Sequence, residues 1–140
     1  YRGLNAGENR SNLFRDEYLI RLPETILLRA EAKMRSGDNA GAADDINLLR
    51  KRAQCDYLVK ASDVNVDLIL DERARETYGE MNRWEDLVRT ETLYERVKKF
   101  NPDAAPNIRE YHKLRPIPQN HIDRLSPKPS AEEAQNEGYY

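Results

Sequence analysis

Apolar residues in the first hundred positions recur every three or four residues, which is the spacing of amphipathic helices. Proline disfavours helix in the residue before it but fits well in a first helical turn. We therefore expect an extended segment over Asp16–Leu22, a helix from Pro23 to about Ser36, and a stop at Gly37. The apolar stripe of this helix consists of Ile26, Leu27, Ala30 and Met34.

A second helix is expected directly after Gly37, because the side chain of Asp38 can accept a backbone N–H bond at its start. Small residues on its apolar face allow a neighbouring helix to approach closely. The two segments therefore predict a tightly packed helical hairpin. The apolar face of the second helix contains Ala42, Ala43, Ile46, Leu49 and Ala53.

Between residues 65 and 100 the same pattern predicts three shorter helices. The single tryptophan, Trp84, shares its face with two aliphatic residues, which favours core packing over stacking on a ligand. The three apolar faces contain, in chain order, Val66, Ile69, Leu70, Ala74 and Thr77; then Trp84, Leu87 and Val88; then Leu93, Val97 and Phe100.

Two arginines fall on these apolar faces, where an unpaired charge would be costly to bury. Arg73 lies in the middle of one face and Arg50 lies beside Ile46, so we expect both to be largely buried and paired. Glu31 is the expected partner of Arg50 across the hairpin. The predicted structural ion-pair network consists of Glu31, Arg50, Glu72, Arg73, Glu76 and Asp86, with Glu80 as a further candidate partner.

Residues 101–140 contain six of the seven prolines and show little apolar periodicity. Loops this long in a compact protein are usually functional, wrapped around a neighbouring part of the structure, or disordered. We expect such a wrap here, with a single helical turn at Gln119–Asp123. Ile117, between two prolines, and the tail Gln135–Tyr140 are expected to pack against the helices or against a preceding region of the protein.

Length and charge limit the class of protein. A chain of 140 residues suits a single domain with one core, and a net charge of −2 with mixed signs argues against a nucleic-acid partner. The single cysteine, Cys55, excludes an intrachain disulfide and a cysteine metal site, and His112 and His121 lack ligand-like spacing. No apolar run approaches the ~20 residues of a membrane span. The first residue is not Met, and we expect the chain to be a piece of something longer.

Acidic pairs could supply the two carboxylates of a glycosidase, but their helical spacing and neighbouring arginines favour solvated helix faces or ion pairs. Cys55 and His112 could be imagined as nucleophile and base, although no local signature supports that chemistry. We therefore expect no catalytic residue, no metal and no cofactor. The acidic pairs are Asp44 with Asp45, Glu72 with Glu76, and Glu132 with Glu133.

Eight tyrosines make this the dominant aromatic residue. Tyr57, Tyr94 and Tyr111 lie in polar contexts, where a ring can stack on a sugar while its hydroxyl stays in water. They are the candidate ligand-binding residues, and partial burial at the base of a loop is the alternative for each.

The predicted hairpin resembles a tetratricopeptide unit, because Ala30, Gly37, Ala42 and Ile46 approach the spacing of its small and apolar positions. Four blocks of sequence, in order, further resemble the C-terminal portion of the SusD/RagB family. The blocks are RLPETILLRAEAKMRSGD, DDINLLRKRA, ILDERARETYGEMNRWEDLVRT, and RPIPQNHI with the ending QNEGYY. The resemblance covers about Asp16 to Tyr140, and Met81-Asn82 and Pro23 depart from the family pattern.

This resemblance implies an all-α fold of tetratricopeptide-like hairpins with a long proline-rich C-terminal loop region. Residues 1–140 would be the C-terminal part of a SusD-like domain: a loop over 1–15, a helical core over 16–100 and the wrap over 101–140. The N-terminal part of the family, with its lipid anchor, would lie outside the chain.

The family implies a function without enzymatic activity: binding a nutrient, most often a glycan, at the outer face of the outer membrane. It implies delivery of that nutrient to a SusC-like TonB-dependent transporter. The residues themselves leave two alternatives open, a tetratricopeptide-type scaffold for a protein or peptide and, more distantly, a carboxylate hydrolase.

Overall fold

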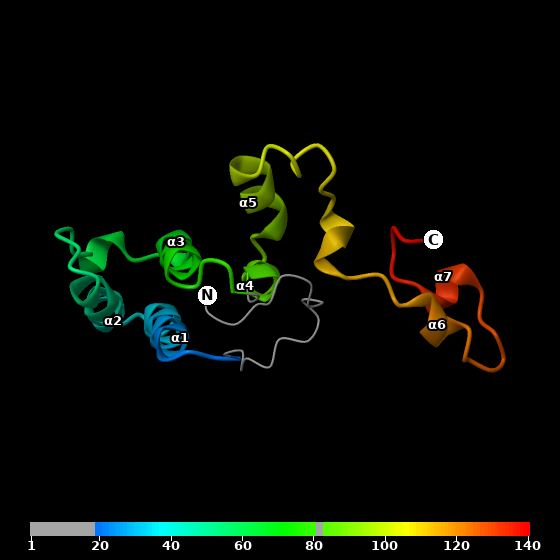
Figure 1. The fold of residues 1–140 in the computed structure, drawn as a ribbon, viewed down its shortest axis with the longest axis horizontal. Helices are drawn as coiled ribbons and strands as arrows, with labels where there is room; N and C mark the ends of the chain where they lie inside the picture. The colour runs from blue at the N-terminus through cyan, green and yellow to red at the C-terminus, as the bar shows by residue number, and fades with distance from the viewer. Residues whose placement is uncertain (1–18, 81–82) are drawn as a thin grey trace, which may run out of the picture. The chain divides into compact units, whose positions relative to one another are not determined.

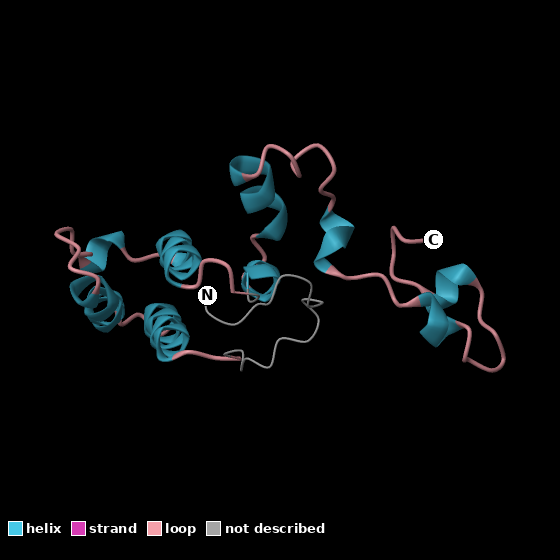
Figure 2. Ribbon diagram, viewed as in Figure 1, coloured by secondary structure: helices cyan, strands magenta, loops and turns pink. Residues whose placement is uncertain are grey.

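The computed structural model describes residues 19–80 and 83–140, and every regular element among them is a helix (Figures 1 and 2). The expectation of an all-α fold is confirmed within these ranges. The expected loop over residues 1–15 and the start of the extended segment at Asp16 lie outside the described residues. The chain forms two compact units, Tyr1–Asn65 and Val66–Tyr140, and each is described by itself.

The first unit contains the predicted hairpin, α1 (Leu22–Arg35) and α2 (Asn39–Arg52), which pack side by side. Helix α1 begins one residue before Pro23, after an extended Arg21. Gly37 ends the helical run with a φ of +90°, a backbone conformation that costs glycine little. The carboxylate of Asp38 then accepts the N–H of Gly41 at 2.8 Å and caps α2 as predicted.

Both helices bury most of the apolar faces that their spacing predicts, but Met34 is half-buried and Ala53, the residue that ends α2, is exposed. The segment after α2, which includes the short 3₁₀ helix η2 (Ala61–Asp63), packs on the same core. The buried apolar residues of this unit are Ile26, Leu27, Ala30, Ala42, Ala43, Ile46, Leu49, Val59 and Val64.

The second unit begins with α3 (Val66–Glu76), α4 (Arg83–Arg89) and α5 (Leu93–Phe100), the three helices expected between residues 65 and 100. Leu70, Leu87 and Leu93, one from each helix, form the centre of its core. Four partly buried residues pack around this centre: Val66, Trp84, Val88 and Val97.

The region predicted as an extended wrap contains three short helical segments. One of them, α6 (Gln119–Ile122), coincides with the predicted turn. The 3₁₀ helix η3 (Glu110–Lys113) and α7 (Ala131–Ala134) were not predicted. The sequence does carry a signal for α7, because the Ser130 hydroxyl caps the helix and Glu133 binds back to the N–H of Ser130.

Candidate functional site

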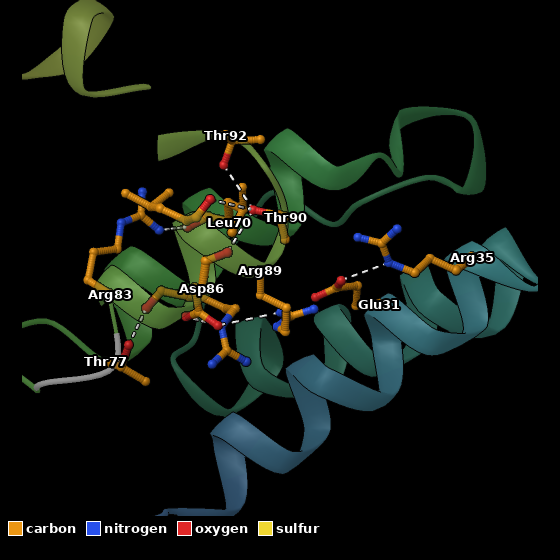
Figure 3. Close-up of polar contacts among 11 residues, drawn as sticks. Glu31, Arg35, Leu70, Thr77, Arg83, Asp86, Arg89, Thr90 and Thr92 are labelled. Atoms are coloured by element: carbon orange, nitrogen blue, oxygen red, sulfur yellow. Dashed lines mark hydrogen bonds and ion pairs between the residues drawn. The ribbon is translucent and has the colours of Figure 1, made fainter. Parts of the chain in front are cut away.

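The polar centre of the second unit is an ion pair between Arg73 of α3 and Asp86 of α4. Arg73 is only 2% exposed, and its Nε lies 2.6 Å from the Asp86 carboxylate, which is itself buried. Arg89 approaches the other carboxylate oxygen of Asp86 at 3.5 Å (Figure 3). The RWxDL block of the sequence therefore supplies the acid that satisfies the arginine buried in the preceding helix.

Backbone carbonyls around this ion pair are also hydrogen-bonded by side chains (Figure 3). Thr77 donates to the carbonyl of Arg73 at 2.7 Å, and Thr90 donates to the carbonyl of Asp86 at 2.7 Å. Arg83 donates to the carbonyl of Leu70 at 2.8 Å. These bonds fasten the last turns of α3 and α4 and connect the two helices, so the side chains of Thr77, Arg83 and Thr90 have a structural role.

A second buried cation, Arg96 of α5, was missed by the sequence analysis. It donates to Asp67 and Asp71, which lie four residues apart on α3, and therefore connects the two helices. The aliphatic part of its side chain is buried, and its guanidinium lies 5.0 Å from the ring centroid of Phe100. Leu93 and Phe100 lie three and four residues from Arg96, so Arg96 also falls on an apolar helix face. The same pattern led to the prediction that Arg73 is buried, and it could have identified Arg96.

In the first unit, Asp45 of α2 is a buried acid that two cations of α1 reach. Arg29 binds it at 2.7 Å and Lys33 at 3.0 Å. Burial opposes the ionisation of Asp45, but the hydrogen bonds from Arg29 and Lys33 outweigh that effect and lower its pKa below the ordinary value. This inter-helix link was also missed by the sequence analysis.

The predicted partnership of Glu31 with Arg50 is replaced by other contacts in the structure. Glu31 is buried and binds Arg35, one turn later on α1, at 2.8 Å. Arg50 is only half-buried, in contrast to the prediction of large burial, because its guanidinium turns to the loop after α2. There it donates to the carbonyl of Tyr57 at 3.1 Å and lies 5.3 Å from the centre of the Tyr57 ring.

The remaining acids of the predicted network lie on α3. Glu72 is buried and pairs with Arg75 on the same helix, and Glu76 is half-buried.

Asn47 of the INxxR block is a further structural residue that the sequence analysis missed. The N–H of Val59 donates to the side-chain oxygen of Asn47 at 2.8 Å, and the side-chain nitrogen of Asn47 donates to the carbonyl of Val59 at 2.9 Å. Together, Asn47 and Arg50 fasten residues 57–59 against α2. The asparagine and the first arginine of this block therefore position a loop.

The three candidate tyrosines lie in separate surroundings. Tyr57 is 61% exposed and its carbonyl is bound by Arg50. Tyr94 is half-buried on α5, where its hydroxyl accepts a hydrogen bond from Lys98 at 2.8 Å. Tyr111 is half-buried against the C-terminal tail. The structure brings no two of them together within a unit, and ligand binding by any of them stays a prediction.

Trp84 packs against the core centre formed by Leu70, Leu87 and Leu93, but it is half-buried. Its ring lies beneath the guanidinium of Arg115, whose Cζ is 4.9 Å from the ring centroid. Trp84 also lines a pocket of about 610 Å³, whose other lining residues are mostly apolar. Its lining includes Asp71, Arg83, Leu93, Arg96, Val97, Phe100 and Asn101.

The C-terminal tail binds the proline-rich segment through the residues of its QNEGYY ending. Gln135 bonds both backbone groups of Ile117, at 2.7 and 3.0 Å, and Asn136 donates to the carbonyl of Arg115 at 2.7 Å. The Tyr139 hydroxyl donates to the carbonyl of Leu114 at 2.9 Å. We call these contacts between residues 135–139 and 114–117 the C-terminal clasp.

Gly138 allows the clasp to close on Tyr111. Its φ is +87°, and a Cβ atom at this position would lie 2.4 Å from Cγ of the Tyr111 ring. Tyr111 in turn meets the ring of Tyr139 edge-on, with centroids 5.2 Å apart. Ile117 and the tail therefore bind each other, and the expected packing of either one against the helices or a preceding region stays a prediction.

No cluster of potential metal ligands occurs among residues 19–80 and 83–140. Cys55 is exposed in the first unit, while His112, in the second, accepts the N–H of Arg109 on Nδ1 at 2.8 Å. Of the helices in these same ranges, none has the length and apolar character needed to cross a membrane.

Two curated relatives match this chain. It is 38% identical over 125 residues to the starch-binding protein SusD of Bacteroides thetaiotaomicron, a match that covers 86% of the chain and 21% of SusD. It is 31% identical over 140 residues to the SusD-like protein P25 of Formosa agariphila, covering 93% of the chain and 26% of P25. The chain thus spans about a quarter or less of each relative's length, and no solved structure matches it.

The model of the SusD family matches residues 3–139, nearly the whole sequence. The blocks that suggested this family are the ones whose side chains fasten α2, α3, α4 and the C-terminal clasp in the structure. The chain belongs to the SusD family.

Proposed function

We propose that this chain is the helical supporting part of a cell-surface protein that binds a glycan and has no enzymatic activity. The main observation that supports this proposal is that polar side chains of the family blocks make structural contacts within the chain. Arg73 binds Asp86, Asn47 binds the Val59 backbone, and Gln135 binds the Ile117 backbone. Such a scaffold fits a binding function, because it presents surfaces and loops without supplying reactive groups.

The glycan is inferred from the relative that binds starch, to which the chain is 38% identical. We call a polypeptide that contains this sequence and has the full length of its relatives the family-length protein. On this proposal, the family-length protein binds an oligosaccharide. That protein is held at the outer face of the outer membrane by a lipid on an N-terminal region. It delivers the sugar to a SusC-like TonB-dependent transporter.

The test is a glycan array probed with the family-length protein, followed by capture of the transporter from outer-membrane extracts. We expect binding to one class of oligosaccharide, with no hydrolysis product in the bound fraction. Variants Tyr57→Ala, Tyr94→Ala and Tyr111→Ala then ask whether the candidate tyrosines contribute. Release of shortened sugars by the purified protein would contradict the proposal and favour the hydrolase.

A tetratricopeptide-type scaffold for a protein or peptide is the second candidate, and one observation favours it. The α1–α2 hairpin exposes three leucines, Leu22, Leu28 and Leu48, at 71%, 41% and 53%. Exposed apolar groups on helices are common elements of protein interfaces. If Leu28→Ser abolished transporter capture and left glycan binding intact, the hairpin would be assigned to the protein partner.

A further inference from the structure

The pocket beside Trp84 combines an apolar lining with an excess of positive charge. Its walls include Leu93, Val97 and Phe100. Arg83 and Arg96 contribute two guanidinium groups, against the one carboxylate of Asp71. Phe100 is 57% exposed, so a large apolar side chain at the pocket mouth is left in water. An apolar surface of this kind favours contact with an apolar partner.

The charges around the pocket are only partly balanced within the described residues. Asp67 and Asp71 pair with Arg96, whose buried Nε still has no acceptor. Arg83 is bound to a backbone carbonyl, and Arg115 lies over the Trp84 ring. Neither Arg83 nor Arg115 has a carboxylate within ion-pair distance in the described part of the chain. Charge complementarity therefore favours an occupant with an acidic group.

The lining favours a polypeptide over a sugar. Aliphatic side chains such as Leu93 and Val97 fit apolar side chains, whereas a pyranose ring needs a flat aromatic face and many hydrogen-bonding groups. One face of the Trp84 ring is already covered by Arg115. The C-terminal clasp holds this arrangement, because Asn136 binds the backbone of Arg115.

The size of the pocket favours a segment of the same polypeptide over a separate protein. A volume of about 610 Å³ holds a few side chains, whereas a stable interface between separate proteins buries roughly 1,200 Å² or more. A tethered segment needs far less contact area, because its effective concentration is on the order of millimolar. The matched segment is 21% of the length of SusD and 26% of that of P25, so most of each relative lies outside it.

We propose that the Trp84 pocket receives an apolar segment with an acidic side chain, supplied by the part of the family-length protein outside residues 1–140. The apolar side chains of this segment cover Phe100, and its carboxylate faces Arg83. This intramolecular docking does not rest on glycan binding, so either proposal can fail without the other.

The experiment measures the rate at which a maleimide labels a cysteine at the pocket mouth. Cys55 is first replaced by Ser, and Phe100→Cys is compared between residues 1–140 and the family-length protein. We expect labelling to be slower by about tenfold or more in the longer protein, since the thiol reacts only when the segment opens. Tyr78→Cys, at a position that is 90% exposed and absent from the pocket lining, is the matched control and should label at one rate in both.

A second comparison tests the charge. In the family-length protein, Arg83→Glu should restore fast labelling of Phe100→Cys, while Arg83→Lys should keep it slow. If Phe100→Cys fails to fold, Asn101→Cys, another lining residue, replaces it. Equal labelling rates in the two proteins would overturn the proposal. Labelling of Phe100→Cys in residues 1–140 that slows as the protein concentration rises would indicate a second copy in the pocket and would also overturn it. Labelling that slows on addition of oligosaccharides would indicate a sugar site, with the same consequence.

Discussion

At the scale of single residues, the Arg73–Asp86 ion pair is the contact on which the second unit depends most. Both side chains are withdrawn from water, so removing Arg73 leaves the Asp86 carboxylate charged and buried, with only the longer contact to Arg89 at 3.5 Å. We expect Arg73→Ala to lower the free energy of unfolding by about 3–5 kcal/mol. A urea titration followed by circular dichroism measures this change.

Lys128→Ala is the matched control, because the side chains of Lys128 and of its ion-pair partner Asp123 are 67% and 51% exposed. Surface ion pairs contribute about 0–1 kcal/mol, so this variant should unfold close to the parent midpoint. Equal midpoints for Arg73→Ala and the parent would show that the buried pair contributes little.

Asp45 gives the first unit a dependence on pH. The pKa of its carboxyl is lower in the folded chain than its ordinary value of 3.8, so its contribution is present above pH 4 and is lost as pH falls through the folded pKa. Asp45→Asn should destabilise by about 1–2 kcal/mol near pH 7, since it weakens two hydrogen bonds from cations. The difference from the parent should shrink towards pH 3.

Stability curves of the two proteins between pH 7 and pH 3 check this expectation. Asp44→Asn, an exposed neighbour, provides the control and should follow the parent curve at every pH. A difference between Asp45→Asn and the parent that stays constant across this range would rule out the ionised carboxylate as its source.

At the scale of elements, the C-terminal clasp should open when Gly138 is replaced. In Gly138→Ala the new methyl group would overlap the Tyr111 ring, and the positive φ adds strain. We expect the amide N–H of Ile117, which binds Gln135, to exchange with solvent about tenfold faster or more. Hydrogen exchange measured by NMR reports this amide separately from those of α1 and α2.

Gly79→Ala separates overlap from backbone strain, because Gly79 also has a positive φ, of +80°, but an added Cβ would meet nothing within 4 Å. It should leave the exchange of Ile117 unchanged. If both variants raised the exchange rate of the Ile117 amide equally, overlap with the Tyr111 ring would be ruled out as the reason for glycine at position 138.

The elements also show where reading the sequence succeeded. Helices α1 and α2 were located to within one or two residues, because Pro23, Gly37 and Asp38 act locally on the backbone. Helices η3 and α7 were missed, since their short lengths give no apolar periodicity.

At the scale of the whole molecule, residues 1–140 expose large apolar side chains that a self-sufficient protein would usually cover. Leu22, Leu48 and Phe100 are 71%, 53% and 57% exposed. We expect the isolated chain to bind a fluorescent apolar dye, to associate in solution and to unfold over a broad range at modest temperature. Light scattering and calorimetry measure these properties, and a monodisperse monomer with a sharp, high-temperature transition would contradict the expectation.

The sequence by itself determined the helical class, the hairpin, the family and the burial of Arg73, because periodicity and local stop signals act within a few residues. Which partner each polar group takes was decided only by the tertiary structure. Arg50 turned to a loop carbonyl instead of Glu31, and Arg96 reached back 29 residues to Asp67. The physical reason is that burying a charge without a partner costs much free energy, so some partner is required. The packing of segments that are distant in the sequence then decides which oxygen atom lies within hydrogen-bond distance.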